Sequence, residues 1–571
     1  MVQFIKTVAR HIIILILPCF AFSQSTYLPQ GSQYEHFLDR LGIKWQTNPE
    51  LNIFTPKPIS RQVAVNVSEE ADSLSKFYPY DEFYHLNNTD QTMLHSLLMN
   101  NSEWVHGSQA SFKSKKPFLK TFYKTPANFA AVNEKDFFLA IDPVLQEQQS
   151  FQSGNSEHEY LNTKGLTFRG LIGDHLGFSS YITDNQERGP DYFTSRVTAS
   201  GYPAVPGTGY FKYFNGSSSA FDYWDARGSI NFDFWKYFTL QFGYDKNFIG
   251  NGYRTLFLSD YAAPYLFLKL NLRIWKLNYQ NILMELISQH LPGDYLYPKK
   301  YAVVHHLSVN ATRWLNLGLY SNIAFSRVDH FEFSYLNPVI FIPAAQQGNG
   351  SPDKTTIGFD FKANVGHVAQ FYGQLLFNEF VWSQIKNYSA GWWGNKQGLQ
   401  LGFKYVDLFN IKNLDFQAEM NLMRPYSYSH DDTVANWSHY NQSLAHPFGA
   451  NFQEYIGILR YQPTYKWVIE LKCIYNKQGL DSAGVNFGSN ILLNYNTRPR
   501  DYGFSIGSGI PATVVNTTAY VSYQWKENVF LEGTLMYRTY TEYDPAATIR
   551  KNSTMFTLGL RINMFRRMYD Y

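Results

Sequence analysis

One stretch of the chain, Arg424–Gly449, contains the side chains that come closest to a metal site. It places His430 directly before two adjacent carboxylates, Asp431 and Asp432. Paired carboxylates suit calcium, and histidine together with aspartate suits a transition metal. The chain has neither the His-Glu-x-x-His motif of zinc enzymes nor a Cys-x-x-Cys pair, so we expect no metal and no other cofactor. If a metal were bound, Asp431 and Asp432 would be its ligands.

The same stretch is rich in aromatic side chains with polar neighbours, which could stack on sugar rings. The alternative is a long external loop that folds over its surroundings and is held by its own hydrogen bonds. Long loops of this kind often carry function, so we keep both interpretations. The candidate glycan-binding residues of this stretch are Arg424, Tyr426, Tyr428 and Trp437.

A second stretch, Asn247–Tyr265, contains Gly250 and Gly252, which permit tight backbone turns. Their spacing is not that of a dinucleotide-binding loop, and no strand–helix–strand pattern surrounds them. Arg254 in this stretch could pair with a carboxylate inside the protein or contact an acidic glycan. We add Arg254 to the candidate glycan-binding residues.

A third stretch is Trp392-Trp393-Gly394-Asn395-Lys396, just before a predicted strand. Paired tryptophans at a strand end are typical of the aromatic girdle at a membrane interface, and ligand stacking is the alternative. The chain has no Gly-x-Ser-x-Gly elbow and no phosphate-binding loop. The motifs therefore do not indicate an enzyme.

The composition indicates what kind of wall must position these residues. Aromatic residues make up 18% of the 571 residues and charged residues only 17%, yet the mean hydropathy is −0.32. Many aromatics with few charges and modest polarity fit a wall with one lipid-facing and one wet face. The net charge of +3 and the lack of a dense basic run exclude nucleic acid as an expected partner.

From Lys135 to Phe565 apolar and polar residues alternate strictly, which predicts strands with two different faces. In Leu414–Leu422 the even positions are apolar and the odd positions polar, and Ile357–Val365 repeats the pattern. Trp467–Tyr475 does the same, which directs Cys473 toward lipid. The sequence therefore predicts an all-β, antiparallel transmembrane barrel.

Connection lengths support the same topology, because short turns alternate with long aromatic and Gly-rich loops. A bacterial barrel has short periplasmic turns, long external loops and an even number of strands. We count about 18 strands, or 20 if Val485–Asn494 and Tyr502–Gly509 form a further hairpin. The predicted short turns are Trp235-Lys236, Arg313-Trp314, Gly366-His367, Gln462–Tyr465 and Lys526–Asn528. The predicted long loops are Asn185–Trp224, Asn247–Ala262, Arg327–Lys354, Val381–Asn395, Pro425–Gly449 and Tyr540–Asn552.

The N-terminal part divides into a leader and a polar segment. Residues 1–23 have a basic start, a short apolar run and a small-x-small cleavage site, which predicts a signal peptide. Residues 24–134 form the predicted periplasmic or plug segment, and an irregular strap along the base of the barrel is the alternative. Helices are expected at Gln33–Leu41 and Gln91–Asn100, with Asp90 as the N-cap of the second. Residues 135–571 form the predicted barrel.

Several motifs occur along nearly the whole mature chain: Leu38–Lys44 followed by Lys57-Pro58, Gly250–Asp260, Trp392–Lys396, Met423–His430 and His439–Pro447. Together they resemble the Wzi-like family of outer-membrane barrels, and within it the gliding-motility, RemB-like branch. The resemblance implies an 18-stranded barrel with a helical periplasmic segment. It also implies a surface lectin for capsular polysaccharide in the capsule members. In the gliding branch it implies a role in cell movement beside the type IX secretion and adhesin apparatus.

We therefore expect a monomeric, non-enzymatic barrel in the cell outer membrane, in contact with its lipid. Its expected role is gliding motility, attachment of capsular or surface polysaccharide, or both. Its expected partners are that polysaccharide or components of the gliding and secretion apparatus. The alternative is an outer-membrane pore or nutrient transporter, because strand alternation alone does not separate an open lumen from a filled one.

Overall fold

The computed structural model describes residues 25–46, 48–52, 55–81, 83–155, 157–173, 176–234, 237–327, 332–337, 342–350, 353–379, 381–482 and 484–571. The predicted signal peptide and the predicted turn at Trp235-Lys236 lie outside these residues. No helix in the described part of the chain has the length and apolar character needed to cross a membrane.

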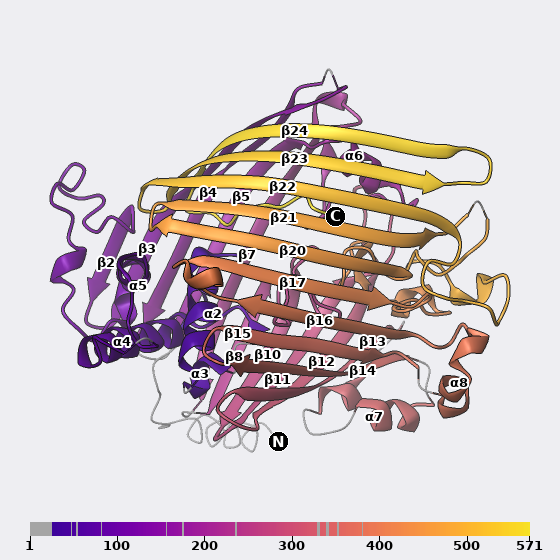
Figure 1. The fold of residues 1–571 in the computed structure, drawn as a ribbon, viewed down its shortest axis with the longest axis horizontal. Coiled ribbons are helices and arrows are strands. Elements are labelled where there is room, and N and C mark those ends of the chain that lie inside the picture. Colours follow the sequence, from indigo (N-terminus) through magenta and orange to yellow (C-terminus); the bar gives the residue numbers. More distant parts are fainter. Residues whose placement is uncertain are drawn as a thin grey trace, which may run out of the picture.

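Eighteen antiparallel strands form a closed barrel (Figure 1). This number confirms the lower of the two predicted counts. In the described residues of the range 481–509 the chain forms no strand, and Ser482 and Val485 make an isolated bridge. In chain order the strands are β3 (Phe137–Gln152), β4 (Glu159–Ile172), β5 (Leu176–Arg188), β7 (Phe221–Phe234), β8 (Phe238–Asp245), β10 (Tyr265–Ile274), β11 (Leu277–Ile287), β12 (Lys299–Asn310), β13 (Leu315–Phe325), β14 (Lys354–Val365), β15 (Ala369–Phe377), β16 (Gln397–Tyr405), β17 (Leu414–Met423), β20 (Phe452–Thr464), β21 (Trp467–Leu480), β22 (Ile510–Lys526), β23 (Val529–Tyr543) and β24 (Thr548–Ile562).

The two faces of the strands follow the alternation in the sequence. In β17, Asp415, Glu419 and Asn421 point inward and are buried, and the apolar residues between them face outward. Cys473 on β21 lies exposed on the outer face, as predicted. A strand whose residues alternate in this way fits only between an apolar and a polar environment, which explains the two-residue period.

One predicted external loop is wrong. Tyr540–Asn552 was expected to be a long loop, but β23 continues to Tyr543 and β24 begins at Thr548. The ladder therefore extends to the pair Tyr543–Thr548, with only residues 544–547 between the strands. Threonine and tyrosine dominate the end of β23, and both favour paired, extended backbone.

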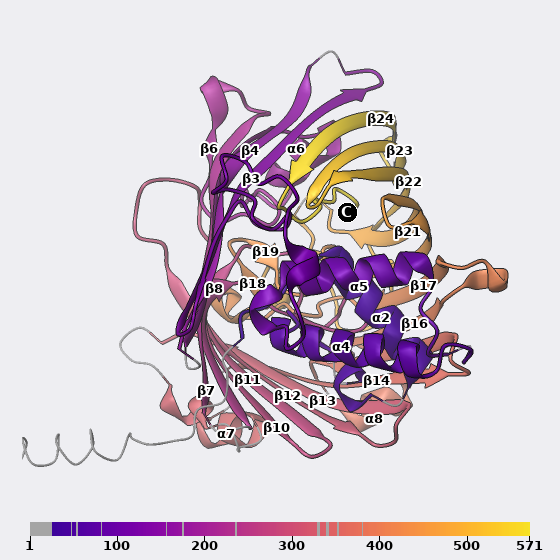
Figure 2. The ribbon, with the colours of Figure 1, turned by 90° about the vertical axis from the view of Figure 1, so that its left-hand side faces the viewer.

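The N-terminal segment folds into helices at the end of the barrel where the short turns lie (Figure 2). Their apolar faces share one core that contains Leu41, Trp45, Val65 and Leu97. Helices packed around their own core form a compact unit rather than an irregular strap. The helices are α2 (Gln33–Trp45), α3 (Pro49–Asn52), α4 (Arg61–Phe77) and α5 (Asn88–Asn100).

The structure corrects two details of this segment. The N-cap of α5 is Asn87, whose side chain accepts a hydrogen bond from the backbone N–H of Asp90 at 2.9 Å, and not Asp90 itself. Helix α4 was not predicted, because its exposed face carries enough polar residues to hide a narrow apolar stripe.

Arg40 of α2 attaches this segment to the barrel. Its guanidinium contacts Asp415 at the start of β17 and lies 3.0 Å from Oδ1 of Asp407 in the preceding turn. Lys44 lies 2.7 Å from the other oxygen of Asp407. Burial alone would raise the pKa of Asp407, but Arg40 and Lys44 outweigh it and hold that pKa well below its usual value.

At the seam that closes the barrel, the first strand, β3, pairs with two different strands along its length. β24 pairs with β3 only from Leu145 to Gln152. The lower part of β3 pairs instead with the short β2 (Ala130–Glu134). Where β24 ends, the chain turns into the barrel, and residues 563–571, here called the tail, lie in the lumen (Figures 1 and 2).

Candidate functional site

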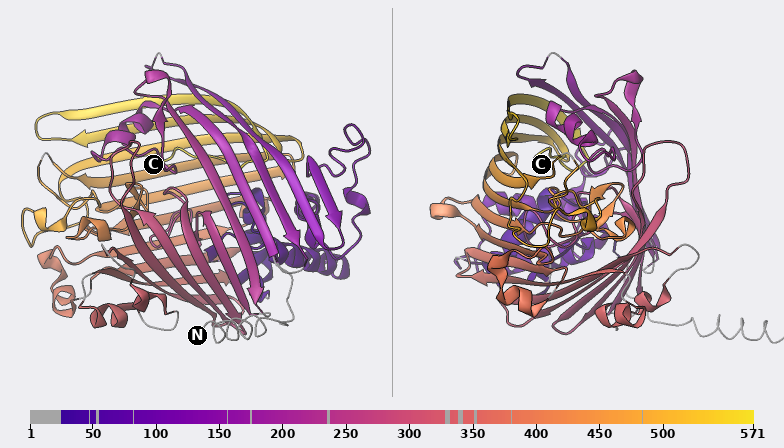
Figure 3. Two further views of the ribbon diagram at one scale, coloured as in Figure 1. Left: turned by 180° about the vertical axis from the view of Figure 1, so that it is seen from behind. Right: turned by 90° about the vertical axis from the view of Figure 1, so that its right-hand side faces the viewer.

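Two loops fold back into the barrel and fill much of its interior. Residues 246–264, after β8, and residues 424–451, after β17, together form what we call the inner plug. The indole N–H of Trp437 donates to the carbonyl of Phe257 at 3.0 Å, and the hydroxyl of Tyr428 donates to that of Leu256 at 2.6 Å. These residues belong to the largest buried apolar cluster of the described chain. Figure 3 shows these and neighbouring loops lying across the loop end of the barrel.

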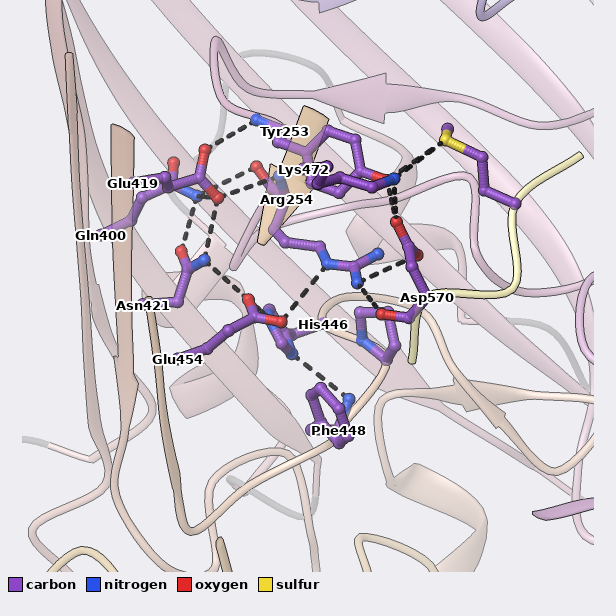
Figure 4. A network of polar contacts seen from close by, with 12 residues as sticks. Tyr253, Arg254, Gln400, Glu419, Asn421, His446, Phe448, Glu454, Lys472 and Asp570 are labelled. Atoms are coloured by element: carbon purple, nitrogen blue, oxygen red, sulfur yellow. Dashed lines mark hydrogen bonds and ion pairs between the residues drawn. The ribbon is translucent and has the colours of Figure 1, made fainter. Parts of the chain in front are cut away.

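Arg254 lies inside the lumen in a network of charged groups (Figure 4). Its guanidinium lies 3.2 Å from a carboxylate oxygen of Asp570 in the tail and 3.7 Å from one of Glu454. Glu419 accepts hydrogen bonds from the backbone N–H groups of Tyr253 and Arg254, at 2.7 and 3.0 Å. Of the two sequence interpretations of Arg254, the described contacts correspond to pairing with lumenal carboxylates.

The tail is fixed by charge pairs along its length. Arg566 pairs with Glu470 at 2.9 Å, and Asp570 lies 2.5 Å from the ammonium group of Lys472. Arg567 donates to Asn185 of β5 and Tyr223 of β7, which lie six and seven strands from β21 around the barrel. The tail thus connects strands that are distant around the wall.

Arg424 and Tyr426 hold three external loops together. The guanidinium of Arg424 donates to the carbonyls of Asn395 at 2.6 Å and Phe504 at 3.1 Å. The hydroxyl of Tyr426 donates to the carbonyl of Asn486 at 2.7 Å. The candidate glycan residues of this loop are all buried, with exposed fractions of 4% for Arg424, 0% for Tyr426 and Tyr428, and 2% for Trp437.

These contacts give each of the four residues a structural role, and glycan contact by their side chains stays a prediction. The buried side chains lie beneath a more accessible group of aromatic and cationic side chains. The ring of Tyr426 packs edge-on against Trp393, with centroids 6.0 Å apart.

The accessible group, here called the mouth platform, consists of Trp393, Tyr495, Arg498 and Lys396. The rings of Trp393 and Tyr495 lie 4.8 Å apart, and the guanidinium carbon of Arg498 lies 4.0 Å from the centre of the Trp393 ring. Trp393, Tyr495 and Arg498 are partly exposed. Lys396 is buried beneath them, and its ammonium group lies 4.0 Å from the centre of the Tyr495 ring. For the tryptophan pair the sequence left a membrane girdle and ligand stacking open; the structure adds that Trp393 packs on loop 481–509, a contact that the local sequence does not reveal.

The two candidate metal ligands lie beside this platform and point to different partners. Asp431 pairs with His430 at 3.0 Å and accepts from the hydroxyl of Tyr495 at 3.3 Å. Asp432 caps a short helical turn through the backbone N–H of Val434 at 3.0 Å. Among the described residues no three His, Cys, Asp or Glu side chains are arranged to hold a metal ion.

His439 anchors the inner plug as a neutral imidazole. Its Nδ1 accepts from the backbone N–H of Ile287 at 2.9 Å, and its Nε2 lies 3.1 Å from the carbonyl of Pro264, to which it donates. Burial, which outweighs the hydrogen bond to Pro264, lowers the pKa of His439 to about 3. The imidazole therefore stays uncharged at neutral pH and uses both nitrogens.

Two cavities remain near the N-terminal helices and the tail. One has a volume of about 300 Å³ and the other of about 490 Å³. Both are bordered by the start of α2, by Arg460 of β20 and by Phe565 and Arg566 of the tail. Pockets that hold small ligands have volumes in this range.

No protein-family model matches this chain, and no curated protein matches its sequence. Among solved structures the chain is similar to Wzi of Escherichia coli, described as an outer-membrane protein involved in group 1 capsule assembly and a carbohydrate-binding β-barrel. The TM-score is 0.55 at 14% identity, and the match covers 95% of this chain and 100% of Wzi. OprD of Pseudomonas aeruginosa gives a TM-score of 0.40 at 11% identity, with 74% of this chain and 94% of that one covered. OccAB4 of Acinetobacter baumannii gives 0.41 at 9%, with 75% and 98% covered.

At such identities the likeness concerns the fold alone. The fold is that of an outer-membrane barrel over nearly the whole chain, and the protein lies in the outer membrane. In bacterial barrels of this fold the long loops are external and the short turns are periplasmic.

Proposed function

We propose that this protein is a non-enzymatic, monomeric outer-membrane barrel that holds surface polysaccharide at its external end. The observation that carries the proposal is the partly exposed aromatic and cationic mouth platform above a plugged barrel. Sugar rings present C–H faces that pack on aromatic rings, and their hydroxyls accept hydrogen bonds from guanidinium groups. Trp393, Tyr495 and Arg498 supply both kinds of contact within a few ångströms.

The interior of the barrel supports this proposal over a diffusion pore or nutrient transporter. The inner plug and the tail occupy the lumen. Ile287 of β11 and Lys300 of β12 tie the plug to the wall through buried hydrogen bonds to His439 and Asn436, and the pair of Asp570 with Lys472 ties the tail to it. A ligand-carrying surface supported by rigid loops needs such fixed contacts, whereas a channel needs an open path. The carbohydrate-binding activity named for the Wzi structure is consistent with the same use of the fold.

The role in gliding motility rests on the motif resemblance. Met423–His430 and His439–Pro447 supply parts of the inner plug and of the support beneath the mouth platform. We propose that a cell that moves over surfaces would use the external end of this barrel beside its secretion and adhesin apparatus. Polysaccharide retention and motility are compatible, since both act through the external loops.

The experiment is a clean deletion strain, in which gliding speed on glass and capsule staining are measured in the same cells. Shed polysaccharide with normal movement would support attachment of polysaccharide. Slowed movement with a normal capsule would support the motility role. A strain with normal movement and a normal capsule would contradict both.

A further inference from the structure

Arg460, in the middle of β20, is an inward-facing cation whose neighbouring carboxylates are both bound elsewhere. In the register of the barrel it lies opposite Asp415 of β17 and Glu470 of β21. Asp415 is contacted by Arg40 and, at 3.1 Å, by His36. Glu470 pairs with Arg566 of the tail.

Arg460 itself makes no ion pair or hydrogen bond to the described residues, and its Nε atom is buried without a partner. A charge removed from water is strongly unfavourable unless it is paired or hydrogen-bonded. Most arginines of the lumen have a carboxylate partner, as the pairs of Arg254, Arg561 and Arg566 show. Arg460 therefore lacks the partner that its position requires.

Two further donors without partners lie at the same place. The hydroxyl of Ser32 and the amide Nε2 of Gln30 are buried and unpaired. Ser32 is the N-cap residue of α2, yet its side chain makes no capping hydrogen bond. The N-terminus of a helix presents free N–H groups and a positive dipole, which both favour an anion.

Gln30, Ser32 and Arg460 border both cavities, so the unpaired donors face a common space. The wall of the smaller cavity includes six arginines. Four of them pair with carboxylates, which leaves Arg61 and Arg460 without an ion pair among the described residues; the paired ones are Arg169, Arg227, Arg561 and Arg566. An oxygen-bearing anion in this space would satisfy the unpaired donors.

We propose that this protein binds an oxyanion group, namely a carboxylate, sulfate or phosphate, between Arg460 and the N-terminus of α2. The planar guanidinium fork matches two oxygens of such a group, and Ser32 and Gln30 donate to the remaining lone pairs. The site is separate from the mouth platform, because it lies in the lumen next to the periplasmic helices. Its failure would leave the proposed surface function unaffected.

Calorimetric titration of the detergent-purified full chain in Tris chloride tests this site. The three probes are inorganic phosphate, sulfate and glucuronate. We expect the unmodified protein to bind the probe and Arg460→Gln to bind it about tenfold more weakly. The loss of affinity for Ser32→Ala should be smaller, because a charged hydrogen bond contributes more than a neutral one. Arg550→Gln, at an exposed position of β24 outside both sites, is the matched control and keeps the affinity. Tighter binding of glucuronate would indicate an acidic sugar, and tighter binding of phosphate or sulfate would indicate a free inorganic anion.

A melting curve without added anion separates this site from a structural role of Arg460. If the guanidinium awaits a ligand, Arg460→Gln melts no lower than the unmodified protein, and only the unmodified protein is stabilised by the probe. Binding of none of the probes, equal affinity of both proteins, or a lower melting temperature of Arg460→Gln without anion would overturn the proposal.

Discussion

The guanidinium of Arg254 and the carboxylate of Asp570 lie 3.2 Å apart, although 316 residues separate them in the chain. Arg254 belongs to the inner plug and Asp570 to the tail, and Lys472 of the wall completes the contact. Plug, tail and wall are thus joined at one carboxylate. Removing that carboxylate leaves two cations without their nearest partner.

We expect Asp570→Ala to destabilise the folded barrel by about 3–5 kcal/mol, because one partner of a buried charge network disappears. The measurement is the temperature at which the folded form, detected by its faster migration in gels, is lost. Asp544→Ala, in the exposed hairpin tip between β23 and β24, is the control and should change nothing. Equal losses in both variants would contradict a specific role of the tail.

Acid should loosen the inner plug through His439. In the folded protein its pKa is about 3, whereas an unfolded histidine has a pKa of about 6.5. Between these values the open state binds a proton that the folded state does not. The free energy that keeps the inner plug closed is therefore at its maximum above about pH 6.5. It falls by roughly 1 kcal/mol per pH unit as the pH drops below that value. Protease cleavage of loop 424–451 should increase from pH 7 to pH 5.

His439→Gln is the matched variant for this effect. Glutamine offers one acceptor and one donor but does not titrate in this range. We expect its cleavage at pH 5 to resemble its cleavage at pH 7 more closely. An acid response that is unchanged in His439→Gln would show that another group is responsible.

The periplasmic helices should detach when Arg40 is neutralised. Arg40→Met leaves the carboxylates of Asp415 and Asp407 in a buried position with fewer partners, and Lys44 compensates only for Asp407. We expect a loss of about 3 kcal/mol in the attachment of the segment, read as faster proteolysis of residues 61–100. Lys76→Met removes an exposed helical pair with Asp72 and should have no measurable effect.

Glycan binding should depend on the mouth platform. We expect Trp393→Ala to weaken binding of the purified protein to capsular polysaccharide by about threefold to tenfold, because an aromatic surface and a cation–π contact are lost. Trp314→Ala, in a turn at the periplasmic end, is the control. Arg424→Met should both weaken binding and loosen the loops. A binding loss for Arg424→Met without any loss for Trp393→Ala would favour direct contact by the buried residues.

The filled lumen predicts little ion conduction. In planar bilayers we expect the purified protein to show no sustained large openings, because the inner plug is held by the buried side chains of Tyr428 and Trp437. An open porin in the same bilayers serves as the reference. Stable, large conductance steps would instead support the pore alternative.

The strands could be predicted from the sequence because each residue of a barrel wall faces one of two very different environments. The run from Leu414 to Leu422 specifies both strand and orientation, and the loop lengths specify which end is external. The N-cap of α5 was misplaced by three residues, since Asn87 and Asp90 are both good capping residues and only the structure shows which side chain accepts.

The candidate site was harder to predict, because local sequence does not show whether an aromatic residue in a long loop faces water. Tyr428 and Trp437 are buried because Leu256 and Phe257, about 170 to 180 residues earlier, offer carbonyls and apolar surface. Arg460 carries no signal in the alternation, since inward charges are ordinary there. Only the structure shows that Asp415 pairs with Arg40 and Glu470 with Arg566. These pairs leave Arg460 without an ion pair among the described residues.

The path of the tail constrains the order in which this protein is assembled. Residues 563–571 follow β24 directly and lie within the ring that β24 and β3 complete. A highly charged segment cannot pass through a finished wall from the lipid side. The tail must therefore enter either before the first and last strands join, or through the end of the cylinder where β24 finishes, next to the N-terminal helices.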